Sequence, residues 1–303
     1  MAGRFKIVVL DDDPTGSQTV HSCPLLLQWD QATLLQGLRD PSPLLFVLAN
    51  TRALAPGAAA ERVRAICRAL NQAIEELAAQ GADAATEGID HWVIVSRGDS
   101  TLRGHFPLEL EAISTELGPF DATFLVPAFL QGGRTTVAGV HLLHGEPVHT
   151  SAFARDGLFG YQNSFLPDWV AEKTAGRVAA EQVEVLGLAA LDGALVDGAQ
   201  IDPAGYQQLC QRLAQVEGQA YVAVDAERPQ HLEALGVAVR ALTAAEAGER
   251  WGRPRRFVFQ SAASLINGLV PLPPQPRDPV ALAALRRRGA EGLPLPGLVL
   301  VGS

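Results

Sequence analysis

Short apolar runs separated by longer stretches of helical spacing constrain the fold of this 303-residue chain more than any other feature. Several runs have the length and composition of buried strands: Phe5–Leu10, Leu44–Ala49, Trp92–Ser96, Thr123–Val126, Tyr221–Val224 and Phe257–Phe259. Helical patterns lie between several of them, at Gly57–Gln80, Pro107–Leu117, Pro203–Val216 and Pro229–Leu242. This alternation predicts an α/β fold with a mainly parallel sheet flanked by helices, a Rossmann-like three-layer sandwich.

Two further segments predict the organisation of the chain. The short Gly- and His-containing stretch Gly139–Thr150 indicates a small β-hairpin lobe. The stretch Leu269–Pro296 is rich in proline, and an apolar run follows it just before the end of the sequence. We therefore expect one α/β domain over residues 1–270, a Pro-rich linker over 271–296, and the first strand of a second, truncated domain over 297–303.

Composition and charge exclude several classes of protein. The formal net charge is −9, which argues against nucleic-acid binding because phosphate neutralisation needs a basic surface. No apolar run approaches 18 residues and no signal-peptide pattern precedes the first strand, so a cytoplasmic protein without a membrane partner is expected. The cysteines Cys23, Cys67 and Cys210 form no C-x-x-C pair and are expected to be reduced.

Lysine is almost absent from the chain, where it occurs only as Lys6 and Lys173. Neither belongs to a G-x-x-x-x-G-K-[ST] motif, so the sequence given contains no P-loop nucleotide site. Arginine therefore supplies almost all of the positive charge.

Polar clusters follow the predicted strands at the point where each strand ends. The clusters are Asp11–Gly16 after the first strand, Asn50–Arg52 after the second, Arg97–Gly104 after the third and Gly132–Thr136 after the fourth, with Asp225 and Gln260–Ser261 near the last two. Ligands bind outside the carboxyl ends of the strands in open parallel sheets. We expect these clusters to converge on one edge of the sheet.

The acidic run Asp11, Asp12, Asp13 has three interpretations. It can be a solvated turn, since Asp, Pro and Gly favour turns. It can be the D-x-D-x-T loop of a haloacid-dehalogenase-type phosphatase, with Asp11 as nucleophile, Asp13 as acid/base and Thr15 in the loop, although the lysine and acidic pair that hold Mg²⁺ in such a site are not evident. It can also supply a general base for a substrate hydroxyl.

The cluster around Arg97 and Arg103 predicts an anion site. Two arginines six residues apart, with Asp99 and Ser100 between them, suit a carboxylate or phosphate, which arginine binds in a bidentate manner. The alternative is a helix cap with surface arginines. The loop with Gly133 and Arg134 gains interest only because it follows a strand of the same predicted sheet.

Three histidines, His141, His144 and His149, lie close together in the sequence. Their spacing matches no usual zinc site, and no acidic or cysteine partner is arranged with them. No metal site is expected in this segment.

Together these clusters make the chain resemble the four-carbon acid sugar kinase family. The matching motifs are Asp12–Gly16, Asp99–Gly104, Pro127–Phe129, Gly133–Gly139, Asp225–Ala226 and Ser261–Ala262. The resemblance implies an N-terminal α/β domain that binds an acid sugar of the threonate, erythronate or 3-oxo-tetronate type. It also implies a C-terminal domain that binds ATP with Mg²⁺, and phosphorylation of the terminal hydroxyl of the sugar acid.

The resemblance and the strand-end clusters give a set of expected site residues. Asp12 and Asp13 are the catalytic candidates, and the substrate-binding candidates are Asp11, Thr15, Arg52, Arg97, Asp99, Ser100, Arg103, Gly133 and Arg134. Our hypothesis is that arginines 97, 103 and 134 fix the carboxylate while Asp12 or Asp13 orients and deprotonates the hydroxyl. The 303-residue chain by itself is expected to be inactive for lack of the ATP-binding domain, and the family would allow a homodimer. The alternatives are a non-catalytic sugar-acid-binding module and the phosphatase.

Overall fold

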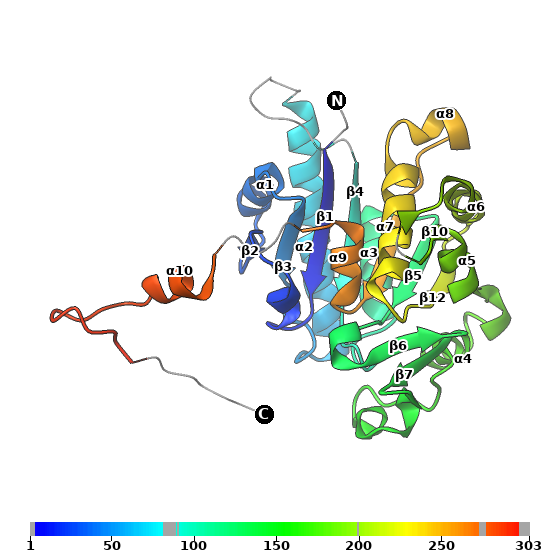
Figure 1. The fold of residues 1–303 in the computed structure, drawn as a ribbon, viewed down its shortest axis with the longest axis horizontal. Helices are drawn as coiled ribbons and strands as arrows, with labels where there is room; N and C mark the ends of the chain where they lie inside the picture. Colours follow the sequence, from blue (N-terminus) through cyan, green and yellow to red (C-terminus); the bar gives the residue numbers. More distant parts are fainter. Residues whose placement is uncertain (1–3, 81–88, 90, 199, 273–276, 297–303) are drawn as a thin grey trace. The chain divides into compact units, whose positions relative to one another are not determined.

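The computed structural model describes residues 4–80, 89, 91–198, 200–272 and 277–296, and the chain divides into two compact units, Met1–Pro271 and Leu272–Ser303. A parallel sheet of eight strands forms the centre of the first unit (Figure 1). In spatial order its strands are β2 (Leu25–Leu26), β3 (Leu44–Leu48), β1 (Phe5–Asp11), β4 (His91–Arg97), β13 (Phe257–Ser261), β5 (Ala122–Val126), β12 (Ala220–Val224) and β9 (Val183–Leu186). The predicted α/β fold is confirmed.

Helices cover both faces of this sheet (Figure 1). One face carries α1 (Gln31–Arg39), α2 (Pro56–Ala79) and α3 (Leu108–Leu117), and the other carries α7 (Pro229–Thr243) and α9 (Ser264–Leu269). The helices α5 (Leu188–Gly193), α6 (Pro203–Ala214) and α8 (Ala247–Trp251) pack beside α7. Strand residues such as Val8 and Ile94 are fully buried against Ile66 of α2 and Ile113 of α3.

Local sequence signals explain where these helices begin. Proline occupies the first turn of α2, α6 and α7, where its missing N–H costs nothing. The Asp30 side chain accepts a 3.0 Å hydrogen bond from the Thr33 amide and caps α1. The strands β2 and β9 were not predicted from the sequence, because β2 has two residues and β9 is a four-residue edge strand that contains Glu184.

The order of the strands fixes where a ligand can bind. The chain leaves β1 toward β3 on one side, and it leaves β4 toward the opposite side of the sheet, where β5 lies. The ends of β1 and β4 therefore flank a crevice, the topological switch point at which open α/β sheets bind ligands. Asp11 and Arg97 are register partners at these two strand ends.

A small lobe follows β5 and confirms the predicted hairpin. It contains the antiparallel strands β6 (Arg134–Val137), β7 (Val140–Leu143) and β8 (Glu146–Pro147), followed by helix α4 (Leu166–Lys173). The buried Asp225 after β12 accepts hydrogen bonds from the amides of Ala138 (2.7 Å), Gly139 (2.8 Å) and Leu188 (3.3 Å). One carboxylate thus joins the lobe to the sheet. A separate two-stranded hairpin, β10 (Leu195–Val196) and β11 (Gln200–Ile201), precedes α6.

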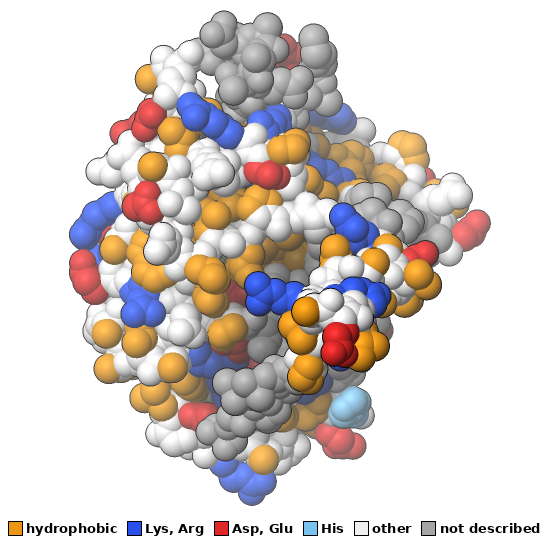
Figure 2. All heavy atoms as spheres, turned by 90° about the vertical axis from the view of Figure 1, so that its left-hand side faces the viewer, with side chains coloured by type: hydrophobic (Ala, Val, Ile, Leu, Met, Phe, Trp, Pro, Cys, Tyr) orange, Lys and Arg blue, Asp and Glu red, His pale blue; other side chains and the backbone are white. Residues whose placement is uncertain are grey.

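The described part of the second unit contains helix α10 (Pro279–Ala284), capped by Asp278, and an antiparallel bridge between Arg288 and Pro294. The strand expected at 297–303 lies outside the described residues. On the face of the protein shown in Figure 2, basic and acidic side chains are interspersed with apolar ones. Among the described residues, no helix combines the length and apolar character needed to cross a membrane.

Asp225→Ala should destabilise the protein by about 3 kcal/mol, because it leaves three backbone donors without their charged acceptor. Urea unfolding would measure the loss, and amide exchange at Ala138 and Gly139 should accelerate. The control Asp30→Ala removes an exposed cap and should cost less. Equal losses in the two variants would contradict the anchoring role of Asp225.

Candidate functional site

The acidic run lies at the switch point and is held by the backbone of both neighbouring strands. The Asp12 amide donates to the Arg97 carbonyl at 3.1 Å, and the Arg52 amide donates to the Asp12 carbonyl at 3.1 Å. Asp11 and Asp12 are 1% and 3% exposed. Gly16 closes the turn beneath them, and a Cβ there would lie 1.9 Å from Asp11 Oδ2, so only glycine fits.

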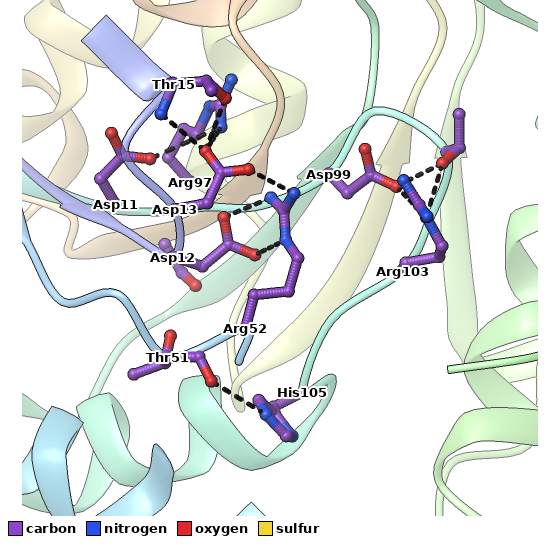
Figure 3. A network of polar contacts seen from close by, with 12 residues as sticks. Asp11, Asp12, Asp13, Thr15, Thr51, Arg52, Arg97, Asp99, Arg103 and His105 are labelled. Carbon is purple, nitrogen blue, oxygen red and sulfur yellow. Dashed lines mark hydrogen bonds and ion pairs between the residues drawn. The ribbon is translucent and has the colours of Figure 1, made fainter. Parts of the chain in front are cut away.

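Two arginines neutralise the three carboxylates (Figure 3). Arg52 binds both oxygens of Asp12, with Nε–Oδ2 at 2.9 Å and Nη2–Oδ1 at 2.5 Å, and it also pairs with Asp13. Arg97 Nη1 lies 3.5 Å from Asp11 Oδ1 and 3.3 Å from Asp13 Oδ1. Charges that would repel one another are thereby kept together inside the fold.

Asp13 is the most exposed of the three carboxylates, with 18% of its side chain accessible. Its Oδ1 accepts hydrogen bonds from the Thr15 amide at 2.8 Å and the Thr15 hydroxyl at 2.6 Å. Burial alone would raise the pKa of Asp13, but these hydrogen bonds and the two arginine charges outweigh it and lower the pKa. Asp13 is therefore ionised and faces the open side of the site.

The other two carboxylates behave differently. Burial raises the pKa of Asp11 to about 7 against the opposing charge of Arg97. Burial also raises the pKa of Asp12 to about 6, although the bidentate hydrogen bonds from Arg52 favour its ionised form. A proton can thus reside on the buried Asp11 and Asp12 near neutral pH.

The next part of the site is the loop from Asp99 to Gly104, here called the 99–104 loop. Asp99 Oδ2 accepts from Arg103 Nε at 2.7 Å and from the Thr101 hydroxyl. The Arg103 guanidinium stacks over Phe153 of the lobe, 4.8 Å from the ring centroid. A Cβ on Gly104 would lie 3.6 Å from Asp12 Oδ2, so this loop passes directly beside the acidic run.

A cavity of about 20 Å³, enough for one water molecule, adjoins this loop. Asp99, Arg103 and Gln260 line its polar side, while Phe106 and Trp169 belong to its apolar side. The Trp169 indole N–H has no partner within the described structure.

Gly133 and Arg134 begin the lobe. Gly133 has φ = 70°, and a Cβ there would lie 2.3 Å from His144 Nδ1, so glycine shapes the turn. The Arg134 guanidinium lies over Phe129, 5.9 Å from its centroid, and Nη1 donates to the Gly132 carbonyl at 2.5 Å. No carboxylate among the described residues pairs with Arg134, and its buried Nε has no partner there.

A second layer of buried polar side chains lies beneath the acidic run, and the sequence analysis did not predict it. Glu109 of α3 is 6% exposed, and its Oε2 lies 3.5 Å from the Ser96 hydroxyl. Burial raises the pKa of Glu109 to about 7. The burial of Glu109 could have been predicted from its spacing. It shares a helix face with Ala112 and Ile113, three and four residues later, and both of these are fully buried.

His105 and His141 complete the buried polar groups near the site. His105 Nε2 lies 3.2 Å from the Thr51 carbonyl, and His141 lies between the Thr136 hydroxyl and the Ser100 carbonyl. Ser100 thus contributes its carbonyl to the lobe contact. The histidines 141, 144 and 149 form no metal cluster in the described part of the chain.

The three aspartates offer oxygen atoms within 4.8 Å of one another, a donor set that Mg²⁺ could use. Arg52 and Arg97, however, already bind both oxygens of Asp12 and Asp13 and one oxygen of Asp11. A divalent cation does not fit beside these guanidinium groups.

The phosphatase interpretation needs a lysine after the acidic run in the sequence. Lys173 is the one lysine that follows the run, and its Nζ lies 3.4 Å from the Gly160 carbonyl in the lobe.

Comparison with known proteins identifies the family. A family described as "Sugar-binding N-terminal domain" matches residues 7–269. The chain belongs to this family. It is the N-terminal domain found in four-carbon acid sugar kinases, as the motifs of the sequence predicted.

A D-erythronate kinase of Heliobacterium modesticaldum is 29% identical to the chain over 174 residues. The match covers 55% of this chain and 36% of that kinase. The chain is therefore related to a sugar acid kinase through part of that enzyme only.

Solved structures share the fold. A domain of unknown function from Bordetella bronchiseptica, crystallised with citrate as a domain-swapped dimer, matches with a TM-score of 0.57 and 22% identity, over 88% of this chain and 57% of that one. A protein of Haemophilus influenzae matches with a TM-score of 0.53 and 18% identity, over 86% and 54%. The chain spans little more than half the length of these relatives.

Glu109→Gln should stabilise the protein at pH 8 by up to about 3 kcal/mol relative to wild type. The folded state holds the Glu109 proton up to about pH 7, whereas the unfolded chain releases it near pH 4.5, so wild type loses stability as pH rises through this window. Glutamine has the shape of glutamate but carries no charge. The extra stability of Glu109→Gln over wild type should therefore vanish below pH 4.5, where the glutamate is protonated in both the folded and the unfolded state.

Urea unfolding at pH 4, 6 and 8 would test this, with Glu111→Gln on the exposed side of the same helix as the control. A constant difference between Glu109→Gln and wild type across these pH values would refute the buried titration.

Proposed function

We propose that this chain is the sugar-acid-binding part of an ATP-dependent four-carbon acid sugar kinase. The substrate is a four-carbon sugar acid of the threonate, erythronate or 3-oxo-tetronate type, and its terminal hydroxyl receives the phosphoryl group. In this proposal ATP and Mg²⁺ bind outside residues 1–270, because Arg52 and Arg97 already contact the carboxylate oxygens of the acidic run. The relation to a D-erythronate kinase supports this proposal.

One observation carries the proposal more than any other. Arginines 52, 97 and 103 are paired with aspartates, whereas Arg134 at the lobe entrance has no carboxylate partner in the described structure. A buried guanidinium edge without an anion favours an anionic ligand. In this proposal Arg134 binds the substrate carboxylate.

Asp13 orients the attacking hydroxyl. It is ionised and more exposed than Asp11 and Asp12, so it can accept a hydrogen bond from the substrate. Phosphoryl transfer through a loose transition state depends on positioning more than on a strong base. Arg52, which is fixed by its bidentate contact with Asp12, also pairs with Asp13 and holds it in place.

The phosphatase alternative loses support because both lysines lie away from the aspartates. Lys173 contacts the lobe carbonyls, and Lys6 is buried at the other end of β1, where it donates to the Asp40 and Ser42 carbonyls. The same site would also serve a non-catalytic binding module, and a turnover assay distinguishes that module from a kinase. Whether the protein forms a homodimer is a separate question, which a measurement of its oligomeric state answers.

Arg134→Ala should weaken binding of threonate or erythronate by roughly 10- to 100-fold, the effect of one charge-assisted contact. Isothermal titration calorimetry would measure it on the 303-residue chain. The control is Arg250→Ala, because Arg250 also stacks on an aromatic ring, Trp251, but lies on α8 away from the site. An affinity unchanged by Arg134→Ala would sink the assigned role.

Asp13→Asn should lower kcat at least about 100-fold in a kinase that carries both domains. Asparagine retains the Oδ1 acceptor for Thr15, so folding should survive. Asp30→Asn is the control at an exposed position, since Asp30 also accepts from the amide and hydroxyl of one threonine, through its two oxygens. Turnover of threonate like that of wild type would exclude Asp13 as the orienting group.

A further inference from the structure

The 99–104 loop has little backbone hydrogen bonding of its own, and its internal contacts come mainly from the Asp99 side chain. Leu102 adopts φ = 64°, a left-handed conformation that is unfavourable for a residue with a side chain, and Gly104 has φ = 136°. Among the described residues, a single backbone hydrogen bond lies within the loop, from the Leu102 amide to the Asp99 carbonyl at 3.2 Å. Contacts from outside the loop therefore help to fix the backbone that carries Asp99 and Arg103.

Two lobe side chains supply those contacts to consecutive carbonyls of the loop. His141 Nε2 donates to the Ser100 carbonyl at 2.8 Å, and the Tyr161 hydroxyl donates to the Thr101 carbonyl at 2.7 Å. His141 is fully buried and Tyr161 is 5% exposed, so water cannot replace either donor without rearrangement.

The hydrogen bonds of His141 determine its tautomer. A carbonyl only accepts, so Nε2 carries the proton and Nδ1 accepts from the Thr136 hydroxyl at 3.0 Å. Burial lowers the pKa of His141 to about 4, so the ring stays neutral across the physiological range.

The histidine is itself anchored to the sheet. Thr136 exchanges two backbone hydrogen bonds with Ala226, at 3.0 and 2.9 Å, directly after β12. A continuous path of hydrogen bonds thus runs from the end of β12 through Thr136 and His141 to the 99–104 loop.

We propose that His141 and Tyr161 are positioning residues, which hold the 99–104 loop in the conformation that binds the ligand. The proposal rests on the proposed function, because it assumes that Asp99 and Arg103 face the sugar acid. Neither residue needs to touch the ligand. Their loss should release the loop, misplace Arg103 and weaken binding while leaving the sheet intact.

Tyr161→Phe removes only the hydroxyl and should weaken sugar-acid binding about 5- to 10-fold, the effect of one buried hydrogen bond. His141→Leu should weaken it at least as much. His141→Gln should restore affinity to within about 3-fold of wild type, since the glutamine amide can donate from the position of Nε2. A merely space-filling role for His141 would give no such difference between leucine and glutamine.

Hydrogen exchange of the unliganded chain gives a second readout that needs no ligand. In Tyr161→Phe, amides of residues 99–104 should exchange about 10-fold faster, while those of β1 and β4 stay unchanged. Tyr206→Phe is the matched control, because the Tyr206 hydroxyl lies on α6, 3.5 Å from the Val237 carbonyl and away from the site. It should alter neither exchange in the loop nor affinity.

The outcomes separate the two proposals. If wild type binds no four-carbon sugar acid, the proposed function fails, and loop exchange still tests the positioning role. If wild type binds and Tyr161→Phe and His141→Leu leave affinity and loop exchange unchanged, the positioning role is overturned. Faster exchange throughout the protein would also overturn it, since the residues would then stabilise the fold as a whole.

Discussion

The site depends on the neutralisation of three adjacent carboxylates at the end of β1. Asp11 and Asp12 could not remain buried without Arg52 and Arg97, which pair with them and with Asp13. The two arginines come from the ends of β3 and β4, on either side of β1. The charge balance therefore requires that both neighbouring strands be paired in register, and the chemistry of the site is tied to the topology of the sheet.

Much of this architecture could be predicted because its signals are local. Apolar runs of strand length alternate with helical stretches, and the polar clusters stand directly after the strands, so the α/β fold and the meeting of these clusters follow from the parallel rule. The hairpin at Gly139–Thr150 was visible in the same way, although it begins earlier, at Arg134.

The pairing of Arg52 and Arg97 with the acidic run could not be read from the sequence, since it depends on contacts between residues 39 to 86 positions apart. The sequence did not distinguish the four candidate arginines 52, 97, 103 and 134. In the described structure, Arg134 is the one of these four without an aspartate partner. Glu109 carries an acidic side chain in the first turn of a helix, and its burial comes from packing of that helix against the sheet. His141 lies in a segment with three histidines, and its contacts with Thr136 and Ser100 became apparent only from the folded lobe.

The placement of β13 has a consequence for how the protein is made. This strand is the last of the sheet in sequence, yet it lies between β4 and β5 near the middle, and its Ser261 carbonyl accepts from the Gly98 amide at the base of the 99–104 loop. During synthesis, the sheet stays divided until residues 257–261 emerge from the ribosome. A chain interrupted before that point would lack the strand that joins the two halves of the sheet.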